Sequence, residues 1–430
     1  MKKYYFRAFV LVCLLVITSV FIGWTDASAG QNKEIITFLG GSTYSWKISR
    51  ALEQVRQNPE TNAVEVRYYT EEDLAAGAID LAVIKNSKIL LVDDMFRTLR
   101  EFAIKEADFS STKIFGLSTV PNDPDKIISD PKVKAYNHPL TRKNLSNLLY
   151  FLMHRELGVS IAYAPPQVVP GQGIFHPQSE KVFSDFDEYL KWYKTSGLYH
   201  PKGYWIGIPE MNTYVYPGET GAVVEKLVTK LESDGMNVLP IYSYPASKSV
   251  NTYFFDPATT RPRVDLVASM AFKFSPHDAQ FAKELFSRLN VPVLNPLRVH
   301  FLTVPEWRDD PQGLGPMEVS YAMANPEMYG LIEPSAIGGK VVQKDALTGK
   351  NLYTYDAIDE NLDFFITRVQ AWLNLKTKAN KDKKVVIMFW NHTPGKQNVG
   401  GTYLNVFRTS TPTSWMTLAK GSRPNAGGGL

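Results

Sequence analysis

The sequence contains almost no cysteine. Its 430 residues include a single one, Cys13, which lies in an apolar run near the N-terminus. If that run is removed as a leader, the mature chain has no disulfide, no thiolate metal site and no cysteine nucleophile. Such a chain can reside in an oxidising compartment.

An excess of charge of one sign is also missing. The sequence has 47 lysine and arginine residues against 43 aspartate and glutamate residues, which gives a formal net charge of +4 at pH 7. Proteins that bind nucleic acids usually carry a pronounced basic excess. The near balance therefore indicates no nucleic-acid partner.

The one long hydrophobic run lies at the N-terminus, where residues 8–24 are apolar and follow three basic residues. Ala27-Ser28-Ala29 comes next and has the small-x-small pattern of a cleavage site. We therefore expect residues 1–29 to be a signal peptide, so that the mature protein is exported to the periplasm. The alternative is an uncleaved leader that anchors the protein, because the run approaches the length of a membrane span.

Metal-ligand spacing and phosphate-binding motifs are absent as well. No two histidines are three or four residues apart, as a helical metal site requires; they are residues 138, 154, 176, 200, 277, 300 and 392. Neither Gly-x-Gly-x-x-Gly nor Gly-x4-Gly-Lys-Ser/Thr occurs. Residues 40–43 therefore predict a turn and helix cap, with an anion cradle at the helix N-terminus as the alternative.

What the sequence does have is a regular alternation of strands and helices. Its length and its 44% apolar content suffice for two to three domains. In the first part of the mature chain the apolar patterns predict strands at 34–40, 64–69, 81–84, 89–92 and 113–117, and helices at 44–57 and 95–104. This order predicts a small doubly wound α/β domain.

A second group of elements follows a linker at residues 121–139. The patterns predict helices at 140–157 and 184–195 around an extended segment at 162–178, then strands at 204–208, 237–242, 264–271 and 291–294 with helices at 220–233 and 277–289. A long helix at 360–376 leads to a last strand at 385–390. We therefore expect an α/β protein with two or more doubly wound Rossmann-like units joined by a helical neck.

The expected domain boundaries follow from these elements. After the signal peptide at 1–29 we expect an N-terminal α/β domain at 30–135, the helical neck at 136–200 and a second α/β domain at 201–345. Residues 346–430 then supply the long helix, the last strand and a Pro-Gly-Lys loop that open a truncated third unit, followed by a glycine-rich tail.

The last strand and its loop form a recognisable sequence motif. The residues that carry it are Asn391, Pro394, Gly395, Lys396, Asn398, Gly400, Gly401, Tyr403, Leu404 and Asn405. Together they resemble the large subunit of the tetrapyrrole metal chelatases, that is, CobN-type cobaltochelatase and the magnesium-chelatase H subunit. Short sequence motifs similar to those of the family occur upstream in the same order, at 197–201, 221–224, 237–240, 290–294 and 330–334. The resemblance therefore covers residues 136 to 410.

The resemblance implies a chain that binds a tetrapyrrole for metal insertion, as in cobalamin biosynthesis. A divalent metal, Co2+ or Mg2+, would be a substrate, no cofactor would be held covalently, and ATP would act only through AAA+ partner subunits. Family large subunits are far longer, so we expect an N-terminal portion that works with the remainder of a split subunit and is not catalytic alone. The alternatives are an exported, non-enzymatic carrier of tetrapyrrole or metal, and a haem-demetallating relative.

The candidate binding residues lie mostly in the Pro-Gly-Lys loop, because open α/β sheets bind ligands at the carboxyl ends of strands. They are His392, Gly395, Lys396, Asn398, Gly400 and Gly401, with Glu306 and Glu327 upstream. Lys396 suits the peripheral carboxylates of a tetrapyrrole, but it also suits a turn cap. The two glutamates either face a binding cleft or fix loops by accepting backbone N–H bonds. No catalytic residue and no metal ligand follows from the sequence.

Overall fold

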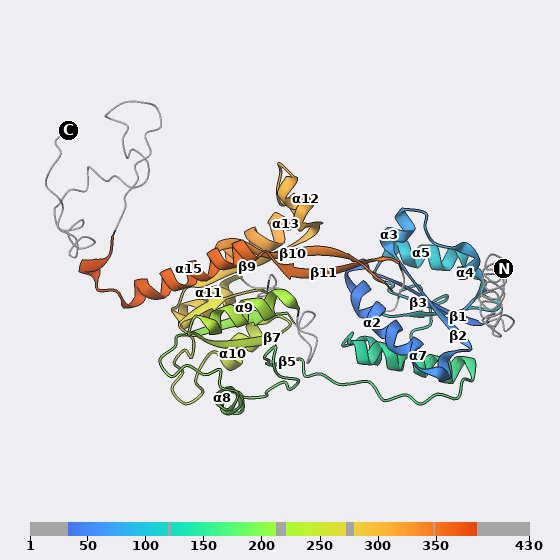
Figure 1. Ribbon diagram of the computed structural model, residues 1–430, viewed down its shortest axis with the longest axis horizontal. Helices are drawn as coiled ribbons and strands as arrows, with labels where there is room; N and C mark the ends of the chain where they lie inside the picture. Colours follow the sequence, from blue (N-terminus) through green and yellow to red (C-terminus); the bar gives the residue numbers. More distant parts are fainter. Residues whose placement is uncertain (1–32, 119–121, 212–220, 272–278, 347–348, 385–430) are drawn as a thin grey trace, which may run out of the picture. The chain divides into compact units, whose positions relative to one another are not determined.

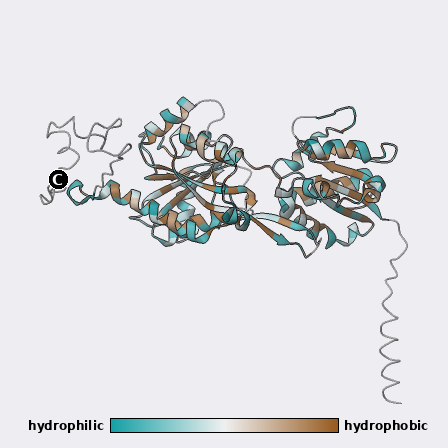
Figure 2. Cartoon of the chain, turned by 90° about the horizontal axis from the view of Figure 1, so that it is seen from above, coloured by the Kyte–Doolittle hydropathy of each residue, from teal (hydrophilic) through white to brown (hydrophobic). Residues whose placement is uncertain are grey.

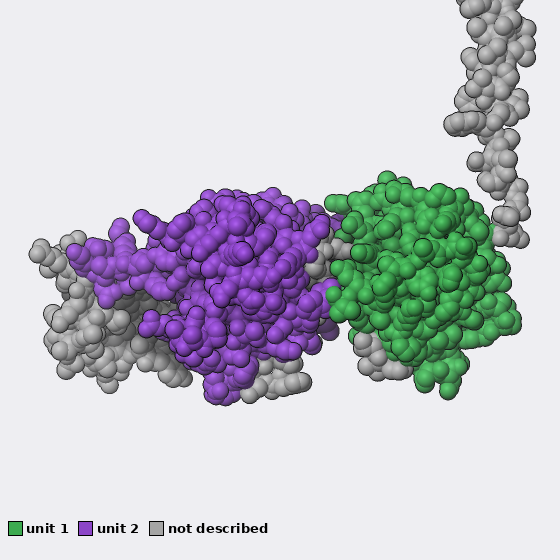
Figure 3. All heavy atoms as spheres, turned by 90° about the horizontal axis from the view of Figure 1, so that it is seen from below, with its two compact units in different colours: residues 1–168, 343–353 green, residues 169–342, 354–430 purple. Residues whose placement is uncertain are grey.

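The computed structural model describes residues 33–118, 122–211, 221–271, 279–346 and 349–384. The chain divides into two compact units, each shown in its own colour in Figure 3. Unit 1 comprises Met1–Val168 and Gln343–Tyr353, and unit 2 comprises Val169–Val342 and Thr354–Leu430. Among the described residues, no helix is both long and apolar enough to cross a membrane.

Unit 1 is built on a four-stranded parallel sheet with the strand order β2-β1-β3-β4 (Figure 1). Its strands are β1 (Glu34–Gly40), β2 (Val64–Thr70), β3 (Ser87–Val92) and β4 (Lys113–Gly116). Its helices are α2 (Ser45–Arg56), α3 (Glu71–Ala75), α4 (Leu81–Asn86), α5 (Arg97–Glu106), α6 (Pro131–Asn137) and α7 (Arg142–Leu157), with short turns η1 (Ser42–Tyr44) and η2 (Pro59–Thr61).

Side-chain alternation along β1 divides the core of unit 1 between the two faces of the sheet. Ile36 and Phe38 pack with residues of α2, α6 and α7, whereas Leu39 packs with residues of α4 and α5. Hydrophobic segments lie in the strands of both units (Figure 2), as expected where helices cover a sheet. Strands β10 and β11 are more polar and mostly half-buried or exposed.

Three predictions for this region need correction. Residues 81–84 start helix α4 and are not a strand, because the Asp80 side chain accepts hydrogen bonds from the backbone of the first turn. The predicted linker contains helix α6, whose Tyr136 is fully buried in the core. The predicted neck at 136–200 is divided between units, since α7 packs on α2 in unit 1 and the second helix belongs to unit 2.

Unit 2 contains a seven-stranded sheet with the order β11-β10-β9-β8-β6-β7-β5. The strands are β5 (Gln172–Ile174), β6 (Trp205–Glu210), β7 (Asn237–Ser243), β8 (Leu266–Ala268), β9 (Val293–Thr303), β10 (Ile332–Lys344) and β11 (Asn351–Ala357). Neighbouring strands from β10 to β7 run parallel, and β5 is antiparallel to β7. Gln343–Tyr353, which comprises the end of β10, the residues after it and the start of β11, belongs to unit 1, and we call it the tip segment.

The helices of unit 2 cover both faces of its sheet. They are α8 (Phe186–Thr195), α9 (Ala222–Ser233), α10 (Ala246–Tyr253), α11 (Ala279–Leu289), α12 (Val304–Asp309), α13 (Pro316–Val319), the π-turn η4 (Ser320–Ala324), α14 (Asn325–Tyr329), α15 (Asp359–Thr377) and the short η5 (Asn380–Asp382). A Cβ atom at Gly207 in β6 would lie 2.4 Å from the ring of Phe254, which follows α10. One at Gly338 in β10 would lie 2.6 Å from Val223 of α9, so both glycines permit close packing.

The predicted elements of unit 2 are largely confirmed. Helices α9 and α15 and strand β7 lie within two residues of their predicted bounds. Gly235, just after α9, takes a left-handed conformation with φ of 79°, as glycines that end helices commonly do. Strand β9 continues to Thr303, well beyond the predicted end, and β10 and β11 were not predicted. The expectation of a mixed α/β protein with parallel strands is confirmed, while the Rossmann-like detail stays a prediction.

Candidate functional site

The predicted site residues fall into two groups. Those of the last loop, His392, Gly395, Lys396, Asn398, Gly400 and Gly401, lie outside the described residues. Glu306 is exposed on α12, where its carboxylate accepts hydrogen bonds from the backbone N–H of Thr303 at 2.8 Å and from its hydroxyl at 2.7 Å. These hydrogen bonds lower the pKa of Glu306. Its visible role is therefore a capping box that fixes the start of α12. Glu327 is exposed in the first turn of α14.

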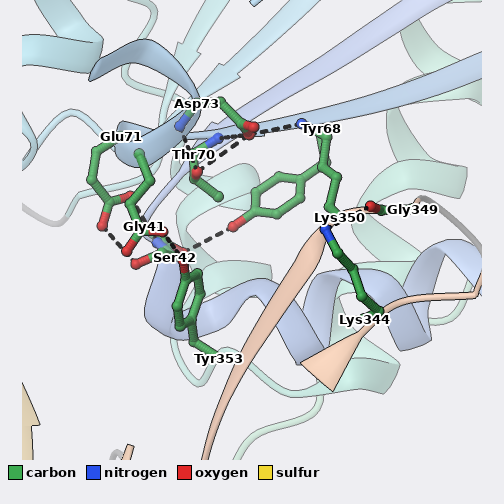
Figure 4. Close-up of polar contacts among 11 residues, drawn as sticks. Gly41, Ser42, Tyr68, Thr70, Glu71, Asp73, Lys344, Gly349, Lys350 and Tyr353 are labelled. Carbon is green, nitrogen blue, oxygen red and sulfur yellow. Dashed lines mark hydrogen bonds and ion pairs between the residues drawn. The ribbon is translucent and has the colours of Figure 1, made fainter. Parts of the chain in front are cut away.

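The turn after β1 holds a carboxylate of the chain itself. The backbone N–H and the hydroxyl of Ser42 donate to the two carboxylate oxygens of Glu71 at 2.7 and 2.8 Å (Figure 4). Glu71 therefore takes the position in which a phosphate group would bind at the helical turn η1, just before α2. The turn itself is present as predicted, and its anion-binding position is filled from within unit 1.

The tip segment contributes further polar groups to the same edge of the unit-1 sheet (Figure 4). The ammonium of Lys350 lies 2.7 Å from a carboxylate oxygen of Asp73 and 4.1 Å from the centre of the Tyr69 ring. Burial lowers the pKa of Lys350, and Asp73 opposes that change. The Tyr353 hydroxyl donates to Glu72.

A cavity of about 340 Å³ lies beside these contacts in unit 1. Its lining consists of Thr70, Glu72, Asp73, Ala76, Lys344, Gly349, Lys350, Asn351 and Tyr353. Two lysines and two carboxylates line it together with polar side chains, so its charges are balanced.

The carboxyl edge of the unit-2 sheet carries a buried ion pair. Strand order reverses around β6, with β7 on one side and β8 on the other, which is the position where open α/β sheets bind ligands. Glu210 ends β6 fully buried and accepts a hydrogen bond from the guanidinium of Arg298 in β9, which is 3% exposed. Burial raises the pKa of Glu210, and Arg298 limits the rise.

His300 lies two residues further along β9, in contact with two tyrosines. Its Nδ1 is 3.0 Å from the Tyr355 hydroxyl, and its ring centre is 6.0 Å from that of Tyr321. Burial, followed by the nearby charge of Arg298, lowers the pKa of His300 to about 4. The imidazole is therefore neutral at pH 7.

Glu318 of α13 fixes the backbone at this position. Its carboxylate accepts the backbone N–H of His300 at 2.5 Å and also that of Phe301. The side chain is 1% exposed, and burial raises its pKa. Glu318 thus holds the end of β9 against α13. In the described part of the chain, no three histidine or acidic side chains are placed to hold a metal ion.

Exposed apolar side chains lie on the same elements as this polar group. Phe301 is 54% exposed, Met317 70% and Val319 37%, and the edge of the Phe301 ring meets Tyr321 with 6.2 Å between the ring centres. We call Phe301, Met317 and Val319 the Phe301 patch. The sequence did not reveal it, because its members come from a strand and a helix and share no motif. The apolar residues on both sides of Glu318 were the only signal.

Known proteins similar to this chain share one family. The sequence profile of the CobN/Magnesium Chelatase family matches residues 134–414. Magnesium-chelatase subunit ChlH from rice, Oryza sativa subsp. indica, is 31% identical over 265 residues, which are 59% of this chain and 18% of that protein. The aerobic cobaltochelatase subunit CobN of Pseudomonas aeruginosa is 23% identical over 274 residues, which are 62% of this chain and 20% of that protein.

A solved structure supports the same relation at the level of the fold. The catalytic subunit of cobaltochelatase from Mycobacterium tuberculosis superposes with a TM-score of 0.51 at 16% identity, covering 83% of this chain and 28% of that chain. The chain spans about a fifth of the length of the curated relatives named above. Because the family profile covers well over half of the sequence, in the region where the resemblance was noticed, this chain belongs to the CobN/magnesium chelatase family.

Proposed function

We propose that this chain binds a tetrapyrrole, as a portion of a chelatase large subunit, and that the macrocycle rests on the Phe301 patch of unit 2. The observation that carries the proposal is the exposed apolar surface of Phe301, Met317 and Val319 beside the half-buried His300. His300 and Phe301 also both contact the ring of Tyr321, with 6.0 and 6.2 Å between the ring centres. A flat aromatic ring system fits such a surface, because aromatic side chains bind it by stacking and edge contacts.

His300 supplies orientation. A neutral imidazole has one donor and one acceptor nitrogen, and Nδ1 already meets the Tyr355 hydroxyl at 3.0 Å, so at most Nε2 can contact a polar group of a macrocycle. A pKa of about 4 makes His300 a weak base at neutral pH, so it is better suited to orient a ligand than to hold a proton taken from a pyrrole nitrogen. This agrees with a chain that presents the macrocycle to catalytic groups supplied elsewhere.

The remaining parts of the proposal come from family membership. A divalent metal, Co2+ or Mg2+, is a substrate of the assembled enzyme, with ATP acting through AAA+ partner subunits, and cobalamin biosynthesis is the pathway that the CobN relation favours. Lys396 of the last loop is a second contact, directed at peripheral carboxylates of the macrocycle. From the sequence alone we also propose that residues 1–29 are an export signal, so that the mature chain resides in the periplasm or stays anchored through an uncleaved leader.

Titration with a water-soluble free-base porphyrin, followed by porphyrin fluorescence, tests the proposal. Phe301→Ser should weaken binding about tenfold, because losing the burial of part of a phenylalanine costs about 1.5 kcal/mol. Phe109→Ser is the matched control, since Phe109 is 49% exposed in unit 1. The proposal fails if wild-type protein does not bind the porphyrin, or if both variants bind as the wild type does.

A further inference from the structure

The cavity of unit 1 shares no lining residue with the Phe301 patch. The described residues that line it come from the end of β2, from α3 and the residue after it, and from the tip segment, and all of them belong to unit 1. Its volume is about 340 Å³. Liquid water occupies about 30 Å³ per molecule, so the cavity has room for roughly ten groups of that size. It therefore suits a small metabolite.

Four charged side chains line this cavity, two of each sign. They are Glu72 and Asp73 of α3, and Lys344 and Lys350 of the tip segment. Their formal charges cancel, so a ligand with a net charge leaves one charge of the cavity uncompensated, whereas a ligand that carries one charge of each sign complements both. Burial of the Lys350 ammonium, which lowers its pKa, shows that water has limited access here and screens these charges less than at an open surface.

Contacts within unit 1 leave one carboxylate oxygen for a ligand. Asp73 uses the same oxygen, Oδ2, for the ammonium of Lys350 at 2.7 Å and for the backbone N–H of Thr70 at 2.8 Å (Figure 4). The Thr70 hydroxyl also meets Oδ2, at 3.2 Å. Among the described residues, no donor contacts the other oxygen, Oδ1. Oδ1 can therefore accept a hydrogen bond from a ligand ammonium while Oδ2 holds its present contacts.

The Lys344 ammonium is the corresponding site for a negative group. Lys344 is exposed, and within the described part of the chain its ammonium contacts the Gly349 carbonyl at a long 3.5 Å (Figure 4). An ammonium has three N–H donors, so a carboxylate can bind to it in addition. Hydrogen bonds between an ammonium and a carboxylate are roughly twice as strong as those between neutral groups.

We propose that the cavity of unit 1 binds a small zwitterion, a polar amino acid, with its ammonium on Oδ1 of Asp73 and its carboxylate on Lys344. The side chains of Thr70, Asn351 and Tyr353 also line the cavity and offer hydrogen bonds to a polar ligand side chain. The proposal goes beyond the proposed function, because the Phe301 patch consists of residues of unit 2.

Calorimetric titration of the full chain with serine, threonine, asparagine and glutamine tests the proposal. The tightest binder should have a Kd at or below about 1 mM. Its N-acetyl derivative lacks the ammonium and its carboxamide derivative lacks the carboxylate. Each should bind at least about tenfold more weakly, because it loses a charge-assisted hydrogen bond. Hydrogen exchange at residues 70–76 and 349–353 should slow when the free amino acid is bound.

Lys344→Met removes the proposed carboxylate contact and keeps most of the aliphatic stem. It should weaken binding of the free amino acid at least about tenfold and leave the affinity for the carboxamide derivative unchanged, since that ligand has no carboxylate to lose. Lys88→Met is the matched control, because Lys88 is an exposed lysine of β3 in unit 1 outside the cavity lining. This control should bind all ligands as the wild type does, and thermal unfolding of both variants should match that of the wild type.

Absence of binding by all four amino acids overturns the proposal. Equal affinities of wild-type protein for the free and blocked ligands overturn the assignment to charged groups, and this comparison does not depend on any variant. Wild-type affinity in Lys344→Met overturns the role of Lys344. Porphyrin affinity, measured in parallel, should be the same in Lys344→Met and in the wild type, so a failure of the amino-acid site remains distinct from a failure of the Phe301 patch.

Discussion

At the residue scale, burial shifts the pKa values of two titratable groups in opposite directions, so folding depends on pH in opposite ways in the two units. Asp93 follows β3 in unit 1, where burial and the charges of Asp94 and Glu71 raise its pKa to about 6. His300 in unit 2 has its pKa lowered to about 4. Between these values acidification favours folded unit 1 through Asp93 and disfavours folded unit 2 through His300.

Asp93→Asn should therefore stabilise unit 1 at pH 7 by about 2 kcal/mol. The folded pKa of Asp93 lies above its unfolded value, so the stability that this group contributes is present at low pH and is lost as the pH rises through about 6. Asparagine keeps the oxygen that accepts the Met95 N–H and carries no charge to bury. Urea unfolding at pH 7 and pH 4.5, resolved by hydrogen exchange in unit 1, measures the difference. No gain of stability at pH 7, or an equal change at both pH values, would contradict the account.

The buried pair of Glu210 and Arg298 leads to a second prediction. Arg298→Met should cost about 3 to 5 kcal/mol, because it leaves the charge of Glu210 buried without a partner. The cost should shrink at acidic pH, where Glu210, whose pKa is already raised, takes up a proton. The double variant Glu210→Leu with Arg298→Met should recover most of the loss. If the double variant is as unstable as the single one, packing rather than charge explains the effect.

At the scale of elements, Glu306 serves helix α12. Thr303→Ala should cost about 1 kcal/mol of stability through the lost cap, whereas Glu306→Gln should cost little, because glutamine also completes a capping box. If Glu306 acts only there, Glu306→Gln leaves porphyrin affinity unchanged in the same fluorescence titration. A loss of porphyrin affinity of tenfold or more in Glu306→Gln would show that Glu306 takes part in binding.

The sequence predicted elements well where period and caps agree. Helix α15 has a long apolar period and β1 a sharp glycine end, and both were located within a residue or two. The strand predicted at residues 81–84 was wrong because a run of four apolar residues fits a buried strand and a buried helix equally well. The Asp80 side chain caps the first turn and thereby favours the helix. Strand β10 was missed because its burial varies along its length without clear alternation.

The candidate site was much less accessible to sequence reasoning. His300, Glu318 and Tyr355 come from three elements, and their contacts depend on the path of β9 beyond its buried half. No residue spacing along the chain predicts that these three side chains lie together. The resemblance to the chelatases, in contrast, identified the family correctly, because it rested on many short sequence motifs in a fixed order.

At the scale of the whole molecule, the chain matches a fraction of each longer relative. We expect that it binds a macrocycle and does not insert metal alone, because it matches only about a fifth of the length of each of these relatives. Incubation of the purified chain with free-base porphyrin and Co2+ or Mg2+ should leave the absorption spectrum free of metallation bands. Turnover by the chain alone would contradict this expectation. Binding without insertion even after partner subunits are added would favour the carrier alternative.

The most direct test of the central claim is hydrogen exchange of the full chain with and without saturating free-base porphyrin. The account predicts added protection at His300 and Phe301 and across 317–321, with the unit-1 strands unchanged. Protection at 391–405 in addition would agree with the proposed contact through Lys396. Protection that leaves 300–301 and 317–321 unchanged, wherever else it falls, would contradict the assignment of the macrocycle to the Phe301 patch.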